Sequence, residues 1–411
     1  MKKYLILLAI FLVKFSLIAQ NRTIQFKHDA AFETVLNEAK REKKLIFLDA
    51  YTSWCVPCKQ MAKDVFTVDS IADFFNNTFI NVGYDMEKGE GITLKKRYAS
   101  DIAAYPTLLF IDGDGVVVHK IVGAPSAKEM INLSRPALDP KASLLGLAKR
   151  YENGDRSLST LTAYFKVLGN AGDRAKIKEV ATGYFDALTP AELKQSENWK
   201  VLGEYLYNTD SKTFNYIFSH QDEFARKVGK DKVLGYIIGN LSGEVGAAST
   251  AYYMKKPVDA QRQLKVMNML RSIGDPRANE LLLRLQLVDF RNKSDWASFN
   301  TTMLQLIGTD SPIKSLETKS SYLLNYTRKF IGSAPDDRLK DAIHWTDLLL
   351  ATDLNPVYKK DLLDFQLKLY TQLKDQAMVQ KVEQEIEVQN KLKEAEVAKG
   401  VKFNSAIRGF M

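Results

Sequence analysis

Hydrophobic and polar positions in the first third of the chain alternate between two spacings. Short apolar runs at residues 45–50, 78–84, 106–111 and 116–122 are typical of strands. The stretches between them carry apolar residues three or four positions apart, which predicts helices. We therefore expect the order β-α-β-α-β-α-β-β-α, beginning with a further strand at residues 23–27. The expected helices cover residues 29–44, 54–66, 90–98 and 126–135, and Asp69 can cap a further short helix at residues 69–75.

After residue 135 the strand-like pattern gives way to helical periodicity. Residues 136–141 contain two prolines and predict a linker. Three Gly-Asp pairs punctuate the helices that follow: Gly154-Asp155, Gly172-Asp173 and Gly274-Asp275. Glycine suits the left-handed residue after a helix, and aspartate suits the cap of the next one. We therefore expect an all-helical domain of helix pairs at residues 142–411, either a degenerate repeat array or an irregular bundle.

The first 19 residues have the pattern of a cleaved secretory signal. Lys2 and Lys3 form a positive end, residues 4–13 form an apolar core, and Ala19 is a small residue at the expected cleavage point. The alternative is a membrane anchor, but the apolar run is too short to cross a bilayer and Lys14 interrupts it. We expect an exported protein of the periplasm or cell envelope of a bacterium, with no stable membrane span after cleavage.

Length and charge limit the class of protein. The chain has 411 residues, which is long for one core, so two or more domains are expected. We assign the signal to residues 1–19 and an α/β domain to residues 20–135, ahead of the linker and the helical domain. The formal net charge is +9, and three of the positive charges lie in the signal. Elsewhere lysines alternate with acidic residues, as on solvated helix faces, so nucleic acid is not an expected partner.

The only two cysteines of the chain, Cys55 and Cys58, lie where a buried strand leads into a helix. Their spacing on a first helical turn lets two sulfurs reach bonding distance, and the unpaired N–H groups there favour a thiolate. We expect Cys55 to be the exposed nucleophile and Cys58 to resolve the mixed disulfide, with Pro57 suited to the first turn. The alternative is a structural disulfide. We expect no metal site, since further ligands at zinc spacing are missing, and no cofactor besides the disulfide.

Several motifs of the first domain stand in the order that one family uses. Asp49 lies six residues before Cys55, Trp54 opens the Trp-Cys-Val-Pro-Cys motif, and Tyr105-Pro106-Thr107 precedes an apolar strand and a hairpin. Over about residues 22–135 the chain resembles the thioredoxin-like family, and it is similar to the C-terminal domain of the thiol:disulfide interchange protein. The resemblance implies an α/β thioredoxin fold, with a central mixed sheet flanked by helices, followed here by the all-α domain.

The resemblance also implies roles for single residues. Asp49 would be the buried proton acceptor for Cys58, and Pro106, in a cis peptide bond, would leave neighbouring backbone groups free to pair with an extended peptide. Three residues are expected to contact the substrate: Trp54, Tyr105 and Pro57. The alternatives are an Asp49 bonded to backbone at the strand end and a Trp54 that belongs to the core. The four histidines of the chain are isolated in sequence and are not expected to take part in the chemistry.

The function expected from these residues is that of an exported thiol:disulfide oxidoreductase. It would reduce or exchange disulfides of protein substrates and would be reduced in turn by a thiol electron donor. Strong oxidants of this fold carry a histidine between the cysteines, whereas Val56 and Pro57 supply no cation, so reduction or exchange is favoured. A thiol reductant in cytochrome maturation would use the same chemistry on another client. The alternative from a different class is an envelope adaptor, whose helical domain recognises a partner and whose thioredoxin domain is not catalytic.

Overall fold

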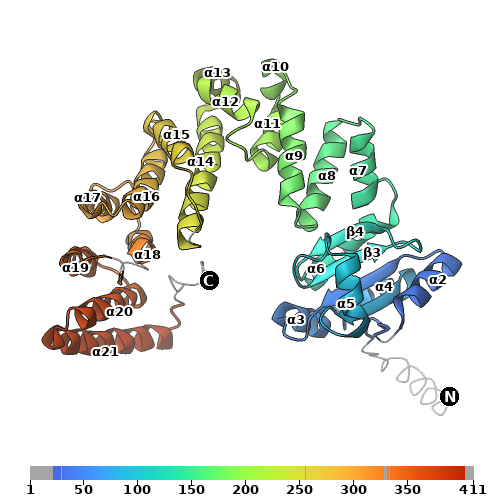
Figure 1. The fold of residues 1–411 in the computed structure, drawn as a ribbon, viewed down its shortest axis with the longest axis horizontal. Helices are drawn as coiled ribbons and strands as arrows, with labels where there is room; N and C mark the ends of the chain where they lie inside the picture. The colour runs from blue at the N-terminus through green and yellow to red at the C-terminus, as the bar shows by residue number, and fades with distance from the viewer. Residues whose placement is uncertain (1–21, 29, 255, 328–330, 333, 403–411) are drawn as a thin grey trace, which may run out of the picture. The chain divides into compact units, whose positions relative to one another are not determined.

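The computed structural model describes residues 22–28, 30–254, 256–327, 331–332 and 334–402 (Figure 1). The predicted signal lies outside these residues. The chain divides into two compact units, and the division falls between Thr213 and Phe214. The first unit contains a sheet, and the regular elements of the second, where it is described, are helices. The expected boundaries on either side of the linker stay predictions, and both lie inside the first unit.

Four strands form one mixed sheet in the first unit, in the order β2-β1-β3-β4. They are β1 (Ile46–Tyr51), β2 (Ile80–Asp85), β3 (Thr107–Ile111) and β4 (Val117–Val122). β1 pairs in parallel with β2 and antiparallel with β3, while β3 pairs antiparallel with β4. The central strands β1 and β3 are buried almost throughout, which is why their apolar runs are nearly unbroken. The mixed sheet expected from the sequence is confirmed.

Helices cover both faces of this sheet, and an apolar cluster lies on each face. The helices are α2 (Phe32–Glu42), α3 (Val56–Asp64), α4 (Asp69–Thr78), α5 (Gly89–Arg97) and α6 (Ala127–Ser134). One cluster joins α2 and α5 to Leu48 of β1. The other joins α3, α4 and α6 to Phe47 of β1, because successive residues of a strand face opposite sides. Asp49, two residues after Phe47, therefore lies on the face covered by α3.

The apolar spacing predicted the helices better than it predicted the first strand. The four residues that set the spacing of α2 are all buried: Phe32, Val35, Leu36 and Ala39. The strand expected before α2 is wrong, since within the described residues 22–28 only Lys27 bridges to β2, opposite Val82. The reason is that the N–H of Ile24 donates to the carbonyl of Phe66, beyond α3, instead of to β2.

The segment after α6 packs on the sheet, and His119 of β4 contacts it. The 3-10 helix η1 (Arg135–Leu138) and the helix α7 (Leu144–Glu152) both lie against β4. In the buried imidazole, Nε2 is 3.1 Å from the carbonyl oxygen of Leu133, and Nδ1 is 3.2 Å from the backbone nitrogen of Leu144. A carbonyl only accepts, so Nε2 carries the hydrogen and Nδ1 accepts from the N–H. Only a neutral ring makes both bonds, and burial lowers the pKa of His119 to about 4.

His119 is expected to make the first unit less stable in acid. Its pKa is about 4 in the folded protein and 6.5 ordinarily, so the unfolded chain binds more protons between these values. The free energy of unfolding then falls by about 3 kcal/mol as the pH falls through this window. Denaturant unfolding of wild type and His119→Gln at a series of pH values checks this. The variant should have the lower free energy of unfolding at about pH 7, and its difference from wild type should shrink by that amount by about pH 4. A deficit independent of pH would contradict the assignment.

The rest of the first unit is helical, and two of the Gly-Asp pairs fall in it. The helices are α8 (Leu158–Asn170), α9 (Arg174–Phe185), α10 (Pro190–Leu193) and α11 (Ser196–Tyr205). Gly172 has a φ of 70°, and Asp173 caps α9, as the pattern predicts. Gly154 has a φ of 91°, but the cap of α8 is Ser157, whose N–H donates to Asp155. The aspartate there binds the capping residue instead of capping the helix itself.

The second unit is built from helices that pack on their neighbours in sequence, as α16 does on α17 and α20 on α21. The helices are α12 (Lys212–Ser219), which spans the division, α13 (Gln221–Val228), α14 (Lys230–Tyr253), α15 (Ala260–Arg271), α16 (Pro276–Asn292), α17 (Trp296–Ile307), α18 (Leu316–Thr327), α19 (Asp336–Leu350), α20 (Pro356–Gln372) and α21 (Gln376–Ala398). Asp275 caps α16. The buried Trp345 donates its indole N–H to Asn300 at 2.7 Å. The all-helical region is confirmed, while the repeat array and the irregular bundle both stay predictions.

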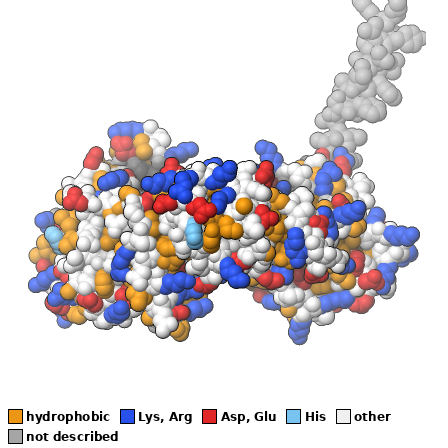
Figure 2. Space-filling model, turned by 90° about the horizontal axis from the view of Figure 1, so that it is seen from above, with side chains coloured by type: hydrophobic (Ala, Val, Ile, Leu, Met, Phe, Trp, Pro, Cys, Tyr) orange, Lys and Arg blue, Asp and Glu red, His pale blue; other side chains and the backbone are white. Residues whose placement is uncertain are grey.

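Charged side chains of both signs are interleaved on the molecular surface. Figure 2 shows lysine and arginine beside aspartate and glutamate over the face that it draws. Some of them pair one helical turn apart, as Lys293 does with Asp289 at 2.7 Å. This is the distribution of solvated helix faces. Within the described ranges, the chain has no helix with both the length and the apolar character needed to cross a membrane.

Candidate active site

The two cysteines are joined in a disulfide at the start of α3. β1 ends at Tyr51, and the carbonyl of Thr52 accepts the N–H of Cys55, which closes the turn into the helix. Cys55 is the N-cap of α3, and its sulfur accepts the N–H of Cys58 at 3.1 Å. The first sulfur therefore lies at the positive end of a helix, where a hydrogen bond and the helix dipole stabilise a thiolate once the bond is reduced.

Both cysteines are buried in the disulfide form. Cys55 is 3% exposed and Cys58 is 5% exposed. The expectation that Cys55 is the more exposed of the two is wrong for this form, because its sulfur turns back over the helix start toward Cys58. The residues around the pair are open: Trp54 is 62% exposed, Val56 is 66% exposed, and Pro57 is exposed as well. An exposed apolar rim thus surrounds a covered sulfur pair.

The loop before β3 lies beside the cysteine loop. Ala50 near the end of β1 pairs with Thr107 at the start of β3. The loop after β1 and the loop before β3 therefore lie at the same end of these two strands. The peptide bond between Tyr105 and Pro106 is cis. The rings of Tyr105 and Trp54 meet edge to face, with 6.0 Å between their centroids. The fold therefore brings together residues of two motifs that are far apart in the sequence.

Two charged residues that the sequence did not single out contact Trp54 and Tyr105. Glu87, just after β2, accepts the indole N–H of Trp54 through Oε2 at 2.9 Å. Lys95 of α5 lies over the ring of Tyr105, with Nζ 5.7 Å from the ring centroid. Both come from segments that are polar in any case, so nothing in the pattern of the chain marks them. Their contacts hold the exposed Trp54 and the partly buried Tyr105 in place beside the cysteines.

Asp49 is a buried carboxyl next to the end of β1. The residue is 7% exposed, and Oδ1 makes no hydrogen bond to any described residue. Burial raises its pKa to about 7, because surroundings of low dielectric disfavour the ionised form. A carboxyl group that titrates near neutral pH can both accept and return a proton under ordinary conditions. The buried aspartate that the resemblance implies is therefore present.

A cavity of about 520 Å³ lies between the N-terminal segment and the sheet face covered by α3. Asp49 and Cys58 both line it, so the buried acid and the second cysteine border the same space. Thr52 lines it too, and its buried hydroxyl oxygen has no hydrogen-bond partner within the described residues. His28 and Lys59 also belong to the polar part of the wall. This arrangement suits transfer of a proton from the Cys58 thiol to the carboxylate of Asp49.

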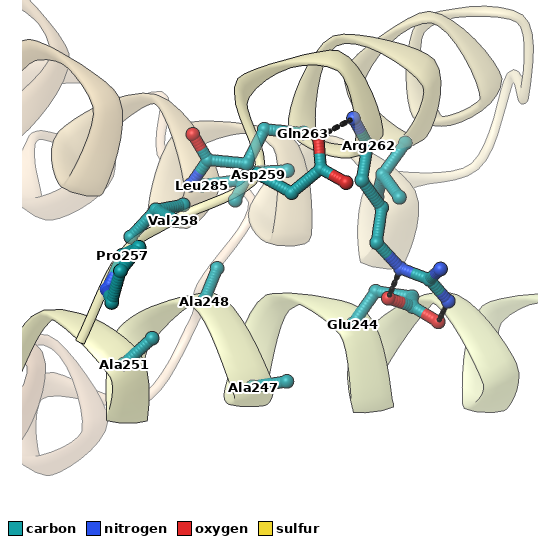
Figure 3. A pocket seen from close by; sticks show the side chains of 11 residues that line it. Glu244, Ala247, Ala248, Ala251, Pro257, Val258, Asp259, Arg262, Gln263 and Leu285 are labelled. Carbon is teal, nitrogen blue, oxygen red and sulfur yellow. Dashed lines mark hydrogen bonds and ion pairs between the residues drawn. The ribbon is translucent and has the colours of Figure 1, made fainter.

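A smaller cavity, of about 160 Å³, lies between α14 and α15 in the second unit (Figure 3). Its wall is mostly apolar, and Arg262 donates to both carboxylate oxygens of Glu244 at 2.7 Å along one side. It contains no cysteine. Across the described residues, no three histidine, cysteine or acidic side chains are grouped so as to hold a metal ion. The expectation of no cofactor besides the disulfide stays a prediction.

Comparison with known proteins assigns the first domain. Residues 32–136 match the family described as "Thioredoxin-like domain". The matched residues contain the mixed sheet, the disulfide at the start of α3 and the cis peptide bond before β3. Residues 32–136 form a thioredoxin-like domain. The helices that follow lie outside the match, so it covers the smaller part of the chain.

The thioredoxin-like domain also relates the chain to thiol:disulfide interchange proteins. The chain is 28% identical over 96 residues to "Thiol:disulfide interchange protein DsbD" of Yersinia pestis (strain Pestoides F). The aligned region covers 23% of this chain and 16% of that protein. It is 30% identical over 91 residues to the protein of the same name from Pseudomonas sp. (strain JR1 / K1), which covers 22% and 15%. The chain therefore spans less than a fifth of the length of these relatives.

Solved structures resemble the thioredoxin-like domain as well. A proposed disulphide-isomerase from Bacteroides thetaiotaomicron is 44% identical, with a TM-score of 0.27, and the match covers 29% of this chain and 98% of that chain. A thioredoxin from Thermus thermophilus is 18% identical, with a TM-score of 0.26, and the match covers 28% and 90%. Each match covers nearly all of the other chain and less than a third of this one.

Proposed function

We propose that the protein is a thiol:disulfide oxidoreductase that reduces or exchanges disulfides of other proteins. The observation that carries the proposal is the Cys55–Cys58 disulfide at the start of α3, with Cys58 and the buried Asp49 lining one cavity. A purely structural disulfide would need neither a helix start at Cys55 nor a carboxyl with a raised pKa on the cavity that Cys58 lines.

The proposed reaction begins with the dithiol form. The Cys55 thiolate attacks one sulfur of a partner disulfide, forms a mixed disulfide and releases the other partner sulfur as a thiolate. Cys58 gives its proton to Asp49, and the resulting thiolate attacks the sulfur of Cys55. The mixed disulfide breaks, the second partner sulfur leaves as a thiolate, and Cys55–Cys58 closes. The partner disulfide has gained two electrons, and the enzyme dithiol has lost them.

The direction that we propose is reduction or exchange. Val56 and Pro57 place no cation between the sulfurs, so the reduced form lacks the extra stabilisation that makes a strong oxidant. A thiol donor would then be needed to return the pair to the dithiol form. Export of the chain is part of the proposal, because the pattern of residues 1–19 is that of a cleaved signal. The clients would accordingly be disulfide-containing proteins of the periplasm or envelope.

A second candidate is an adaptor whose disulfide does not cycle. The burial of Cys55 in the disulfide form favours it, because a covered sulfur is not open to attack by a thiol donor. The exposed rim of Trp54, Val56 and Pro57 would then serve binding alone. The two candidates agree on the fold and differ only in whether the sulfur pair opens.

Reduction of insulin by dithiothreitol distinguishes the two functions. We expect the wild-type chain to accelerate precipitation of the insulin B chain over dithiothreitol alone, because Cys55 carries electrons from the small thiol to insulin. The Cys55→Ser variant should give the rate of dithiothreitol alone. Equal rates for wild type and variant would exclude the oxidoreductase and leave the adaptor.

A further inference from the structure

The N-terminal segment places a histidine in line with the buried acid. Lys27 bridges in parallel to Val82 of β2, so His28 stands beside Gly83. Gly83 in turn pairs with Asp49 of β1. Residues paired side by side in parallel strands point to the same face of a sheet. His28, Gly83 and Asp49 therefore form one row across the sheet, and the middle member has no side chain.

The absence of a side chain at Gly83 lets the imidazole lie over β2. A Cβ atom at this position would be 3.1 Å from Cε1 and 3.2 Å from Nδ1 of His28, closer than side chains normally approach. The ring thus occupies the space that a larger residue would fill. Two strand spacings, about 10 Å, separate the backbones of His28 and Asp49. The space between the two side chains belongs to the cavity that both of them line.

The hydrogen bond of His28 determines which ring nitrogen is available. Nδ1 is 2.9 Å from the carbonyl oxygen of Gly83. Since the carbonyl only accepts, Nδ1 carries a hydrogen, and Nε2 of the neutral ring keeps its lone pair. The residue is exposed, so the ring reaches solvent as well as the cavity. Imidazole is the side chain that most readily takes up and releases protons near neutral pH.

The other titratable groups on this cavity are Tyr51 of β1 and Cys58 and Lys59 of α3. Cys58 is the proton donor of the proposed reaction. Lys59 is exposed and adds a basic side chain to the cavity wall. His28 is the one imidazole in the wall, as described, and it also reaches solvent.

We propose that His28 carries the proton from Asp49 to solvent during closure of the disulfide, an inference that rests on the proposed oxidoreductase function. Cys58 gives its proton to the carboxylate of Asp49 and attacks Cys55. The proton passes on from Asp49 through solvent in the cavity to Nε2 of His28 while the sulfur of Cys58 attacks, so its exit is part of closure, and the imidazolium releases it to bulk water. Asp49 returns to the carboxylate, and no electrons move in this step. His28 thus acts on the proton of Asp49 and does not touch the reacting sulfurs.

The test follows closure of the disulfide in the full chain. The dithiol protein is mixed with excess oxidised glutathione, and acid quenching with thiol alkylation gives the rate at which the mixed disulfide at Cys55 becomes Cys55–Cys58. We expect His28→Asn to slow this step about tenfold. The asparagine amide can still donate to the carbonyl of Gly83, so the segment keeps its anchor. Added imidazole buffer should restore the rate of the variant and leave that of wild type unchanged.

Three further variants make the outcome specific. Gly83→Val fills the space over β2 that the ring occupies, where a Cβ atom alone would already lie 3.1 Å from Cε1 of His28. It should slow closure with His28 still present, which provides a test if His28→Asn folds poorly. His220→Asn is the matched control, because His220 is also exposed and its Nδ1 also lies 2.9 Å from a backbone carbonyl, that of Tyr216. It should close at the wild-type rate. In an Asp49→Asn background, His28→Asn should add no further slowing, since both residues act on the same proton.

Each outcome decides between separate claims. If wild type closes its disulfide and neither His28→Asn nor imidazole changes the rate, the proton role of His28 is overturned and the oxidoreductase function stands. Full additivity of His28→Asn and Asp49→Asn overturns it as well, because the two residues would then act independently. Failure of the wild-type chain to form or close a mixed disulfide overturns the proposed function itself.

Discussion

A Cys58→Ala variant is expected to accumulate a mixed disulfide at Cys55 that wild type passes through too quickly to detect. The reason is that Cys58 supplies the thiolate that breaks the intermediate, and an alanine cannot attack. Cys55 keeps its place at the start of α3, so formation of the intermediate should be unaffected. Mixing the reduced variant with a protein of known disulfide content and separating the products without reductant measures the trapped fraction. We expect nearly all of the variant to be trapped under excess partner.

The matched control for trapping is Cys55→Ala, which retains one cysteine in the same motif. Cys58 lies one turn into α3 and faces the cavity shared with Asp49, so it should trap little partner. Equal trapping by the two variants would show that the two cysteines do not have separate roles. Absence of trapping by Cys58→Ala would contradict the proposed order of attack.

An Asp49→Asn variant is expected to gain stability over wild type as the pH rises. The pKa of Asp49 is about 7 in the folded disulfide form and 3.8 ordinarily, so the folded protein binds more protons between these values. The contribution of the protonated carboxyl is complete below about pH 4 and is lost as the pH rises through about 7, a change of about 4 kcal/mol. Asparagine keeps a polar group of similar size but cannot ionise.

Denaturant unfolding at a series of pH values measures this effect as the difference between variant and wild type. The difference is needed because His119 acts in the opposite direction over an overlapping range, with a pKa of about 4 that makes the fold less stable in acid. The difference should grow in favour of Asp49→Asn by about 4 kcal/mol between about pH 4 and pH 8. Asp310→Asn, at an exposed position in the second unit, is the control and should show no such trend. A flat difference for Asp49→Asn would mean that its carboxyl does not titrate abnormally.

Most of the first domain could be predicted because its elements bury the residues that define their spacing. The apolar residues of α2 and the runs of β1 and β3 are examples, since burial is what the pattern encodes. Asp69 shows a limit: it was expected to cap α4, but it is the first residue of the helix and accepts the N–H of Arg22 instead. Such a bond joins segments far apart in the sequence, and local pattern does not reveal it.

The candidate site divides in the same way. The spacing of the two cysteines at a helix start located Cys55 and Cys58, and the resemblance located Asp49 and Pro106, because these stand in motifs with fixed spacing. It did not locate His28, whose place in one row with Gly83 and Asp49 depends on how the N-terminal segment pairs with β2. The spacing of apolar residues within one strand does not reveal which residues of a distant segment pair with it. The burial of Cys55 was missed for a related reason, since the direction of its sulfur depends on the disulfide and not on its place in the helix.

The central claim is that the Cys55–Cys58 bond opens and closes reversibly. Equilibration of the full chain with mixtures of reduced and oxidised glutathione, followed by alkylation of free thiols, measures this directly. We predict a single two-electron transition with a midpoint clearly more reducing than roughly −120 mV. A midpoint as oxidising as roughly −120 mV would contradict the proposed direction, and a bond that stays closed at every ratio would contradict the function.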